Sequence, residues 1–384
     1  MKTAWVRTTL GEIAEIVSGA TPKTSVGEYW GGGIPWVTPK ELSGLEGSSI
    51  ASTERTLTDA GLRSCAASLL PPQSVLLSSR APIGLVAIND VPMATNQGFK
   101  SLVPDDDRVD AKFLYWWLRS HRARLEAMGN GATFKEVSKK VVDGVAIDLP
   151  PTEEQRRIGV VLDAAEALRL KRRRALAMFD DLAQAIFVDM FGDGSEWPTG
   201  VLGDHVPTTS GGTPSRSRPD YFRGHIPWVK SGELGVELVT ATGEAITDQA
   251  LANSSAKLMP VGTVLLAMYG ATVGEAAVLG IEAATNQAVC CLSPTKSVSG
   301  AYLLGLLRSR KDDLICRAAG GAQPNISQAI IRGLEIPLAP ILVQAKYAER
   351  IAAIDKLRSV ASSSAAEIDT LFASLRQRAF RGEL

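Results

Sequence analysis

The sequence predicts an α+β fold: two similar globular domains, related by a pseudo-two-fold internal repeat and separated by a pair of long antiparallel coiled-coil helices. Two observations lead to this prediction. Nearly the whole chain repeats itself at an offset of about 190 residues, and each copy ends in a proline-free stretch of about 40 residues with apolar residues at helical spacing. We expect a first domain over 1–150, a helix over 151–194, a second domain over 195–340 and a second helix over 341–384.

The repeat indicates a duplicated domain, because its period is far longer than the roughly 20–50 residues of a solenoid repeat. The matching segments keep an offset of 192 early in each copy and drift only to 189 or 190 later. So few insertions over such a length imply one fold used twice. The clearest matches are Trp5 with Trp197, Ser18–Pro22 with Ser210–Pro214, Ile34–Val37 with Ile226–Val229, and Ala94–Gln97 with Ala284–Gln287.

Each copy begins with short strands and ends its globular part with a helix. Gly and Pro interrupt short β-branched runs such as 34–37 and 74–77, which is typical of strands and turns. A segment with apolar residues at helical spacing follows in both copies, around Phe113–Leu118 and Tyr302–Leu307. Each globular unit is therefore expected to be α+β.

The long stretches 152–191 and 341–381 are expected to be helices of roughly 60 Å, at 1.5 Å per residue. Their apolar residues predict a coiled-coil seam, at the helix-pair interface or facing a partner. The helices must be antiparallel, because the few residues from Gly192 to Trp197 cannot cross a rod of that length. The seam residues are Ile158, Leu162, Leu168, Phe179, Leu182, Ile186, Ile351, Ile354, Leu357, Ile368, Leu371 and Leu375.

The composition is that of a globular protein with two cores. The 384 residues are 45% hydrophobic and 21% charged, without the run of about 20 apolar residues that a membrane span needs. The N-terminus lacks the apolar stretch of a secretory signal, so a cytoplasmic location is expected. Four cysteines without a Cys-x-x-Cys pair, and three histidines, predict reduced structural thiols and no metal site.

The formal net charge of zero argues mildly against nucleic acid as a partner, so any basic surface must be local.

The order and duplication of these elements resemble one known family. The alternation of a globular unit and a helix, the Ser-Gly-x-Thr-Pro and Ile-Pro-Trp-Val segments, and the final Arg378–Leu384 are similar to the specificity subunits of type I restriction–modification systems. The resemblance covers the chain from end to end. It implies that each globular unit is a target-recognition domain for one half of a split double-stranded DNA target, and that the helix pair sets the gap between the halves.

The same resemblance implies the partners. Two methyltransferase subunits would dock on the helices, and restriction subunits would join that core. S-adenosylmethionine would bind the methyltransferases, so no cofactor is expected on this chain.

Base recognition uses Arg, Lys, Asn or Gln, whereas phosphates are bound by Lys, Arg, Ser, Thr and backbone amides. Loops with this chemistry provide the candidate DNA-binding residues, although each alone is as well explained as a solvated side chain. They are Thr21, Lys23, Lys40, Arg80, Lys135, Lys139 and Lys140 in the first unit, and Arg216, Arg218, Lys230, Tyr269, Gln323 and Asn325 in the second. As a set they are more persuasive, because several fall in equivalent loops of the two copies.

Other conspicuous residues favour structural roles. Gly19 and Gly211 are expected in turns where glycine permits a positive φ, and this structural role is favoured over phosphate binding. Trp36 and Trp228 follow proline within apolar strands, which favours core packing over base stacking. The Asn-Gln pairs at 96–97 and 286–287 are identical in both copies, so a shared structural role is favoured over base recognition.

The basic cluster at 171–174 is expected to be solvated or partner-facing, with phosphate contact as the alternative.

Recognisable catalytic motifs are missing from the sequence. We find no Walker loop, no Gly-x-Ser-x-Gly elbow and no adenine-methylating loop. Asp105, Asp110 and Lys112 have the acid–acid–lysine order of metal-dependent nucleases, but Asp110 matches Ser299 in the second copy, and both precede a predicted helix. Both are expected to be N-caps, and no catalytic residue is assigned.

Two other hypotheses remain. A helical scaffold that organises partners without binding DNA would agree with the neutral charge. A stand-alone methyltransferase or nuclease is the third hypothesis.

Overall fold

The computed structural model describes residues 5–80, 82–130, 135–192, 195–318 and 324–384. The chain forms two compact units, unit 1 with Met1–Arg173 and Ser364–Leu384, and unit 2 with Arg174–Ser363. Each unit therefore contains one globular domain and a segment of both long helices, α7 (Thr152–Phe191) and α13 (Ile341–Ala379).

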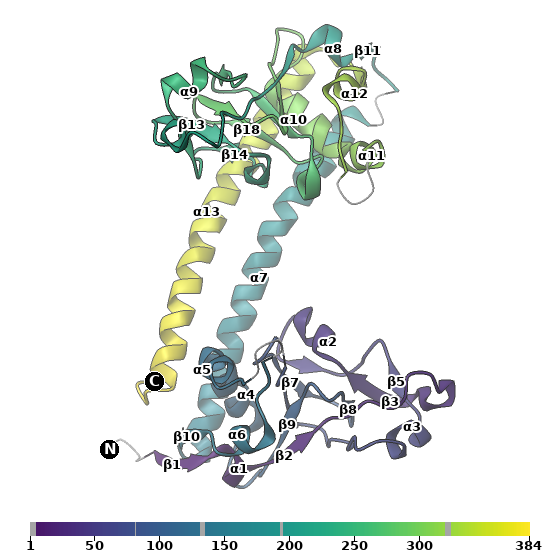
Figure 1. Cartoon of the computed structure of the whole chain (residues 1–384), viewed down its shortest axis with the longest axis vertical. Coiled ribbons are helices and arrows are strands. Elements are labelled where there is room, and N and C mark those ends of the chain that lie inside the picture. Colours follow the sequence, from purple (N-terminus) through teal and green to yellow (C-terminus); the bar gives the residue numbers. More distant parts are fainter. Residues whose placement is uncertain (1–4, 81, 131–134, 193–194, 319–323) are drawn as a thin grey trace. The chain divides into compact units, whose positions relative to one another are not determined.

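Unit 1 contains a five-stranded sheet in the order β2-β9-β6-β7-β4, a three-stranded sheet β5-β3-β8 and a two-stranded sheet β1-β10 (Figure 1). Its strands are β1 (Val6–Thr9), β2 (Ala14–Ser18), β3 (Trp30–Val37), β4 (Ser49–Ile50), β5 (Thr56–Leu57), β6 (Val75–Leu77), β7 (Val86–Asn89), β8 (Ala94–Thr95), β9 (Lys100–Pro104) and β10 (Ala146–Leu149). Its short helices are α1 (Leu10–Ile13), η1 (Gly27–Tyr29), α2 (Pro39–Ser43), α3 (Asp59–Arg63), α4 (Ala111–Ser120), α5 (Arg122–Ala127) and α6 (Lys139–Asp143).

Unit 2 has a five-stranded sheet β12-β20-β17-β18-β14, a four-stranded sheet β15-β13-β19-β16 and a two-stranded sheet β11-β21. Its strands are β11 (Thr199–Val201), β12 (Thr208–Ser210), β13 (Ile226–Val229), β14 (Leu238–Val239), β15 (Ala245–Ile246), β16 (Leu258–Met259), β17 (Val264–Ala267), β18 (Ala276–Leu279), β19 (Ala283–Thr285), β20 (Val289–Leu292) and β21 (Glu335–Pro337). Its short helices are α8 (Leu202–His205), η2 (Pro219–Phe222), η3 (Ser231–Glu233), α9 (Asp248–Ala252), η4 (Gly270–Thr272), α10 (Gly300–Ser309), α11 (Lys311–Cys316) and α12 (Gln328–Arg332).

The two five-stranded sheets have the same strand order once the repeat is taken into account. The central pair β6–β7 starts its register at Val75 opposite Ile88, and β17–β18 starts at Val264 opposite Val278. In both units one strand pair is parallel, β4 with β7 and β14 with β18. The predicted α+β class and the use of one fold twice are therefore confirmed.

The N-caps expected at Asp110 and Ser299 are confirmed. The Asp110 carboxylate accepts a hydrogen bond from the backbone N–H of Phe113 at 3.0 Å, and the Ser299 hydroxyl accepts one from Tyr302 at 3.4 Å. Such a cap satisfies one of the free N–H groups at a helix start. Asp110 therefore has a structural task, which removes the main support for a nuclease triad.

Cys290 and Cys291 lie buried in β20 and form no disulfide. Burial raises the pKa of the Cys290 thiol to about 12 and that of Cys291 to about 11, so both stay protonated at neutral pH. Across the described residues there is no group of three or more His, Cys, Asp or Glu that could hold a metal ion. Nor is any helix in the described ranges both long and apolar enough to cross a membrane.

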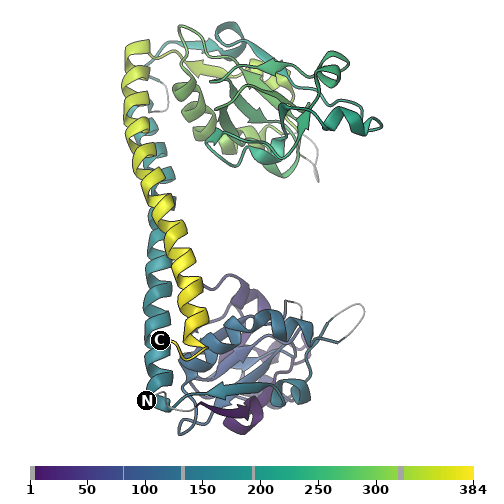
Figure 2. The same ribbon diagram turned by 90° about the vertical axis from the view of Figure 1, so that its left-hand side faces the viewer.

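Within each unit the two long helices run antiparallel. In unit 1, Arg157 donates to the backbone oxygen of Leu384, and Arg169 pairs with Asp369 at 2.7 Å. Residues further along α7 therefore meet residues earlier in α13. Unit 2 shows the same trend, with Arg358 to Asp180 at 2.9 Å and Arg350 to Asp189 at 3.5 Å. Figure 2 shows the α7 and α13 ribbons next to each other in both units.

Four residues of the predicted apolar seam are not buried between the two helices, and their exposure leaves the partner-facing alternative open. Leu168, Leu182, Leu357 and Leu371 are between 46% and 67% exposed. The physical reason is that the buried face of each helix turns toward its globular domain and joins that core. Among the other seam residues, Ile158, Leu162, Ile351 and Ile354 are buried, whereas Phe179, Ile186, Ile368 and Leu375 are half-buried.

A buried glutamine fixes the start of each long helix against its domain. The amide nitrogen of Gln155 donates to the carbonyls of Arg108 (3.0 Å) and Pro150 (2.8 Å), and its oxygen accepts from the N–H of Asp110 at 2.9 Å. Gln344 repeats this arrangement in unit 2, with Ser297, Ala339 and Ser299, all at 2.8 Å. Both glutamines are fully buried.

We expect Gln155→Leu to lower the free energy of unfolding by roughly 2–5 kcal/mol, because it leaves buried backbone groups without partners. Gln344→Leu should have a similar effect. Urea unfolding of the purified chain measures both. The matched control is Gln377→Leu, an exposed position on α13, where a change within about 0.5 kcal/mol is expected. If Gln155→Leu lowered the free energy of unfolding no more than Gln377→Leu, the anchoring role of Gln155 would be contradicted.

Candidate nucleic-acid interface

The Ser-Gly turns of the two copies place a loop against an Asn-Gln turn. A Cβ on Gly19 would lie 2.0 Å from the carbonyl oxygen of Asn96, and one on Gly211 would lie 2.3 Å from that of Asn286. Neither glycine has a positive φ, so that part of the sequence prediction is wrong. Their structural role comes instead from the close approach of two backbones.

The Asn-Gln pairs hold these loops together. Asn96 Oδ1 accepts the N–H of Gly98 at 2.9 Å, and Asn286 Oδ1 accepts that of Ala288 at 3.1 Å. The hydroxyl of Thr21 donates to the side-chain oxygen of Gln97, and Thr213 does the same to Gln287. The shared structural role predicted for these pairs is confirmed, and Thr21 takes part in it.

In unit 1 an arginine lies on a pair of tryptophans. The rings of Trp30 and Trp36 meet edge to face, with centroids 5.0 Å apart. Their indole N–H groups donate to the backbone carbonyls of Lys23 (3.4 Å) and Ala20 (3.1 Å), which ties the loop to β3. The guanidinium carbon of Arg55 lies 3.6 Å from the Trp30 ring centroid. We call Trp30, Trp36 and Arg55 the stacked-arginine site of unit 1.

Unit 2 has the same arrangement, with its arginine supplied by another part of the chain. Phe222 and Trp228 meet edge to face at 5.6 Å, and the Trp228 indole donates to the carbonyl of Gly212 at 3.1 Å. The guanidinium carbon of Arg216 lies 4.1 Å from the Phe222 ring centroid. Trp36 and Trp228 are buried, which confirms their predicted core packing. Phe222, Trp228 and Arg216 form the stacked-arginine site of unit 2.

Carboxylates next to these sites bind several of the predicted cations. Glu54 pairs with Lys40 at 3.1 Å, and this hydrogen bond raises the pKa of Lys40. Glu244 pairs with both Arg216 (2.7 Å) and Lys230 (2.8 Å), whose hydrogen bonds lower the pKa of Glu244. The predicted cations near the stacked aromatic rings therefore already have an anionic partner: Lys40 pairs with Glu54, and Lys230 and Arg216 pair with Glu244.

Arg80 in unit 1 and Tyr269 in unit 2 occupy equivalent positions in another loop of each domain. Arg80 makes a backbone bridge and a 2.9 Å ion pair with Glu136, and Tyr269 makes the corresponding bridge to Asn325. Arg218 pairs with Asp220 at 2.7 Å.

Four predicted lysines make no ion pair with any described residue, and all four are exposed: Lys23, Lys135, Lys139 and Lys140. Lys139 and Lys140 begin α6, which follows closely on Glu136, the partner of Arg80. Gln323 lies outside the described residues.

Arg55 was missed by the sequence analysis, although a signal was present. An offset of 189 aligns Arg55 with Glu244, an exchange of charge two residues after the matched Thr53 and Thr242. The structure supports that alignment, because the carbonyls of Arg55 and Glu244 accept the N–H groups of Trp36 (3.1 Å) and Trp228 (3.0 Å). The two tryptophans are equivalent residues of β3 and β13.

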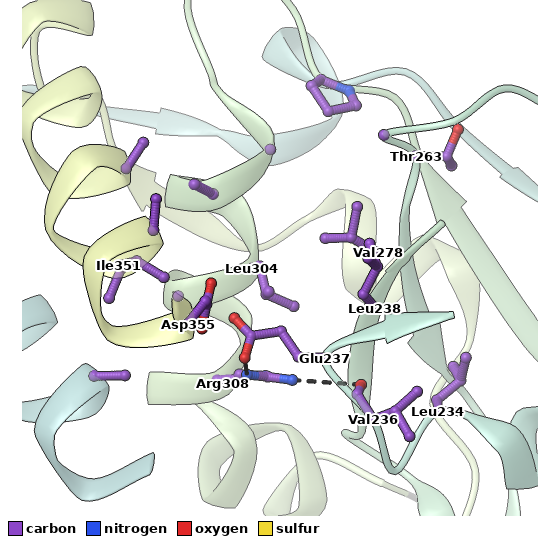
Figure 3. A pocket seen from close by; sticks show the side chains of 18 of the residues that line it. Leu234, Val236, Glu237, Leu238, Thr263, Val278, Leu304, Arg308, Ile351 and Asp355 are labelled. Atoms are coloured by element: carbon purple, nitrogen blue, oxygen red, sulfur yellow. Dashed lines mark hydrogen bonds and ion pairs between the residues drawn. The ribbon is translucent and has the colours of Figure 1, made fainter. Parts of the chain in front are cut away.

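Unit 2 also contains a pocket of about 1310 Å³ between α13, α10 and the β14–β18 edge of its sheet. In Figure 3, Ile351 and Asp355 approach it from α13, and Leu238 and Val278 from the strands. Ala183 also lines it. At the position equivalent to Ala183, unit 1 has Phe372, which packs on Trp116 with ring centroids 5.7 Å apart.

Charged residues beside this pocket link the long helices to the domain. Arg358 pairs with Glu237. Glu237 also lies 3.8 Å from Arg308, as Figure 3 shows for these two side chains. Burial and the nearby Glu237 carboxylate raise the pKa of Asp355. At the equivalent position of unit 1, Glu166 is nearly buried and pairs with both Arg119 (2.8 Å) and Arg169.

The comparisons with known proteins agree on one family. The family described as "Type I restriction modification DNA specificity domain" matches residues 2–176 and again residues 194–368. The type I restriction enzyme MjaIX specificity subunit of Methanocaldococcus jannaschii is 28% identical over 88% of this chain and 84% of its own length.

Two solved structures share the fold over nearly the full length. One belongs to a study of complex assembly and conformational transition in the type I R-M system, with TM-score 0.62, 19% identity, and 99% of this chain and 98% of that chain covered. The other is an S subunit of a type I restriction-modification system from M. genitalium, with TM-score 0.58, 14% identity, and 98% and 96% covered.

The carboxylates Glu166 and Asp355 should differ in their effect on stability. Glu166→Gln breaks a nearly buried pair with two arginines, and we expect it to lower the free energy of unfolding by roughly 3 kcal/mol. Urea unfolding at pH 7 tests this. A change smaller than that of an exposed control, Glu367→Gln on α13, would contradict it.

Asp355→Asn should instead stabilise the chain slightly at pH 7. Because the pKa of Asp355 is raised in the folded state, its stabilising contribution is present at low pH and lost as the pH rises through that pKa. The gain should stay below about 1 kcal/mol, since the side chain is partly exposed. It should shrink toward about pH 4, the usual range of an aspartate pKa. A gain that grows on acidification, measured by thermal unfolding at both pH values, would exclude this explanation.

Proposed function

We propose that this chain, which belongs to the type I restriction modification DNA specificity family and is a specificity subunit of such a system, recognises a bipartite DNA target with one half-site per unit. The observation that supports this most directly is the pair of stacked-arginine sites, one in each copy of the same fold. Both occur beside loops that carry the predicted DNA-binding residues. A site built twice suits a target in two parts.

Linked recognition explains how modest half-site affinities give a specific complex. Once one unit is bound, the second half-site is present at a high effective concentration, so the two affinities combine. The number of base pairs between the half-sites would be a property of α7 and α13, which contribute to both units.

The chain would act without chemistry of its own. Asp110, the central residue of the nuclease-like pattern, caps α4 instead. Methyl transfer would belong to two methyltransferase subunits docked on α7 and α13, which would bind S-adenosylmethionine. Restriction subunits would join through them. The exposed leucines Leu168, Leu182, Leu357 and Leu371 are candidates for these contacts.

A scaffold that does not bind DNA is the second candidate. The ion pairs of Lys40, Lys230 and Arg216 favour it, because cations already paired on the protein gain less from a phosphate. The two candidates differ in what a reversal of these charges would do.

The charge-reversed variant changes Lys23, Lys40, Arg216 and Lys230 to Glu. With the methyltransferase partner present, we expect its Kd for the split target to rise at least about tenfold, and the slope of log K against log salt to fall by about one per lost phosphate contact. Gel-shift titrations between about 50 and 200 mM salt measure both.

The control is Lys296→Glu, an exposed residue near the start of α10, next to Ser297, which anchors α13. Unchanged DNA affinity in the charge-reversed variant would favour the scaffold. Failure of the wild-type complex to bind any split target would remove the proposal altogether.

A further inference from the structure

We propose that Arg55 recognises a guanine in the half-site of unit 1, and that unit 2 lacks this contact because Glu244 holds its stacked arginine. This inference rests on the proposed function and names one residue within it. Four features of the stacked-arginine sites support it: the pre-set orientation of Arg55, its free hydrogen-bond donors, the exchange of charge between the copies, and its place in unit 1.

Stacking sets the orientation of Arg55 before any DNA is present. Its guanidinium carbon lies 3.6 Å from the Trp30 ring centroid and 5.3 Å from that of Trp36. A planar cation held on an aromatic face loses little further freedom when it binds. Two of the guanidinium donors match the O6 and N7 acceptors of guanine in the major groove.

The donors of Arg55 are available for binding. The side chain is exposed, and within the described part of the chain no carboxylate pairs with it. The neighbouring Glu54 carboxylate is engaged by Lys40 at 3.1 Å. Arg55 therefore differs from Arg216 of the other stacked-arginine site and from the nearby Lys40 and Lys230, each of which has an anionic partner.

The repeat shows that the backbone here is fixed while the side chain changes. Thr53 and Thr242 donate their hydroxyls to the carbonyls of Arg55 (2.6 Å) and Glu244 (2.7 Å), the same carbonyls that accept from Trp36 and Trp228. The same local scaffold thus presents a cation in unit 1 and an anion in unit 2. Such an exchange on a common scaffold is expected where two half-sites differ in sequence.

In unit 2 the exchange has a direct consequence. Glu244 binds Arg216 at 2.7 Å, and Arg216 takes the place over the aromatic rings that Arg55 has in unit 1. Because Nη1 of Arg216 already donates to the Glu244 carboxylate, the Nη1–Nη2 edge of Arg216 cannot bind guanine with both nitrogens unless this ion pair breaks. We assign guanine recognition to Arg55 alone, and expect Arg216 to contribute to affinity through its charge.

The position in unit 1 agrees with this role. In Figure 1, β3 and β5 lie at the end of unit 1 remote from α7, where the domain surface is not used to anchor the long helix. Arg55 comes directly before β5, and the Lys23 loop is tied to Trp30 at the same place.

The test uses the full chain assembled with its methyltransferase partner and a DNA library randomised in both half-sites. Methylated molecules are sequenced for wild type, Arg55→Gln, Arg55→Lys and Arg216→Gln. Arg7→Gln on β1 is the matched control, because Arg7 is an exposed arginine of unit 1 outside the stacked-arginine site. Thermal unfolding of each variant checks that the fold is kept.

We expect Arg55→Gln to reduce the preference for guanine at one position of one half-site by roughly 10- to 100-fold, leaving the other half-site unchanged. Arg55→Lys should keep the overall affinity but lose much of that preference, because lysine lacks the planar fork. Arg216→Gln should weaken methylation of all sequences alike, and Arg7→Gln should match wild type.

An unchanged base preference in Arg55→Gln would overturn the inference, as would a loss spread equally over all positions, which indicates a phosphate contact or a packing role. If Arg55→Gln fails to fold, the Arg55→Lys comparison decides. A wild-type complex that gives no split motif would overturn the proposed function itself. A split motif that is unaffected by Arg55→Gln would overturn only this inference.

Discussion

The anchoring of each long helix by one buried glutamine is the constraint on which the rest of the structure depends. Gln155 and Gln344 are fully buried, and each binds three backbone groups from the domain and the helix start. The helix direction relative to its domain is fixed there. Antiparallel ion pairs, such as Arg169 with Asp369 and Arg358 with Asp180, then have their partners in reach. In the proposed function, this anchor would hold each recognition domain on its long helix.

The duplication preserves the backbone and changes the side chains at a few places. Both copies keep the glutamine anchor, the Asn-Gln turn and an arginine over two aromatic rings. They differ in where that arginine comes from, since Glu244 in unit 2 stands where Arg55 stands in unit 1. They also differ beside the long helices, where unit 2 has a pocket lined by Ala183 and unit 1 packs Phe372 on Trp116. If the proposed function is correct, such differences would allow one fold to serve two half-sites.

The sequence predicts the large elements well, because they depend on local periodicity and on the repeat. The domain duplication, the two long helices and the caps at Asp110 and Ser299 could all be found that way. The exposed Leu168 and Leu357 could not, because apolar spacing shows that a helix has a buried face but does not say which neighbour covers it. Arg55 escaped because stacking on Trp30 joins residues that are distant in sequence, and the pairing of Lys40 with Glu54 escaped for the same reason.

The most direct test of the central claim is the methylation pattern of the assembled wild-type complex. Genomic DNA is exposed to the complex and every newly methylated adenine is mapped. Recognition by two units predicts a motif in two short parts of different sequence, separated by a fixed number of unspecified base pairs. A single continuous motif, or methylation without any sequence preference, would contradict the account.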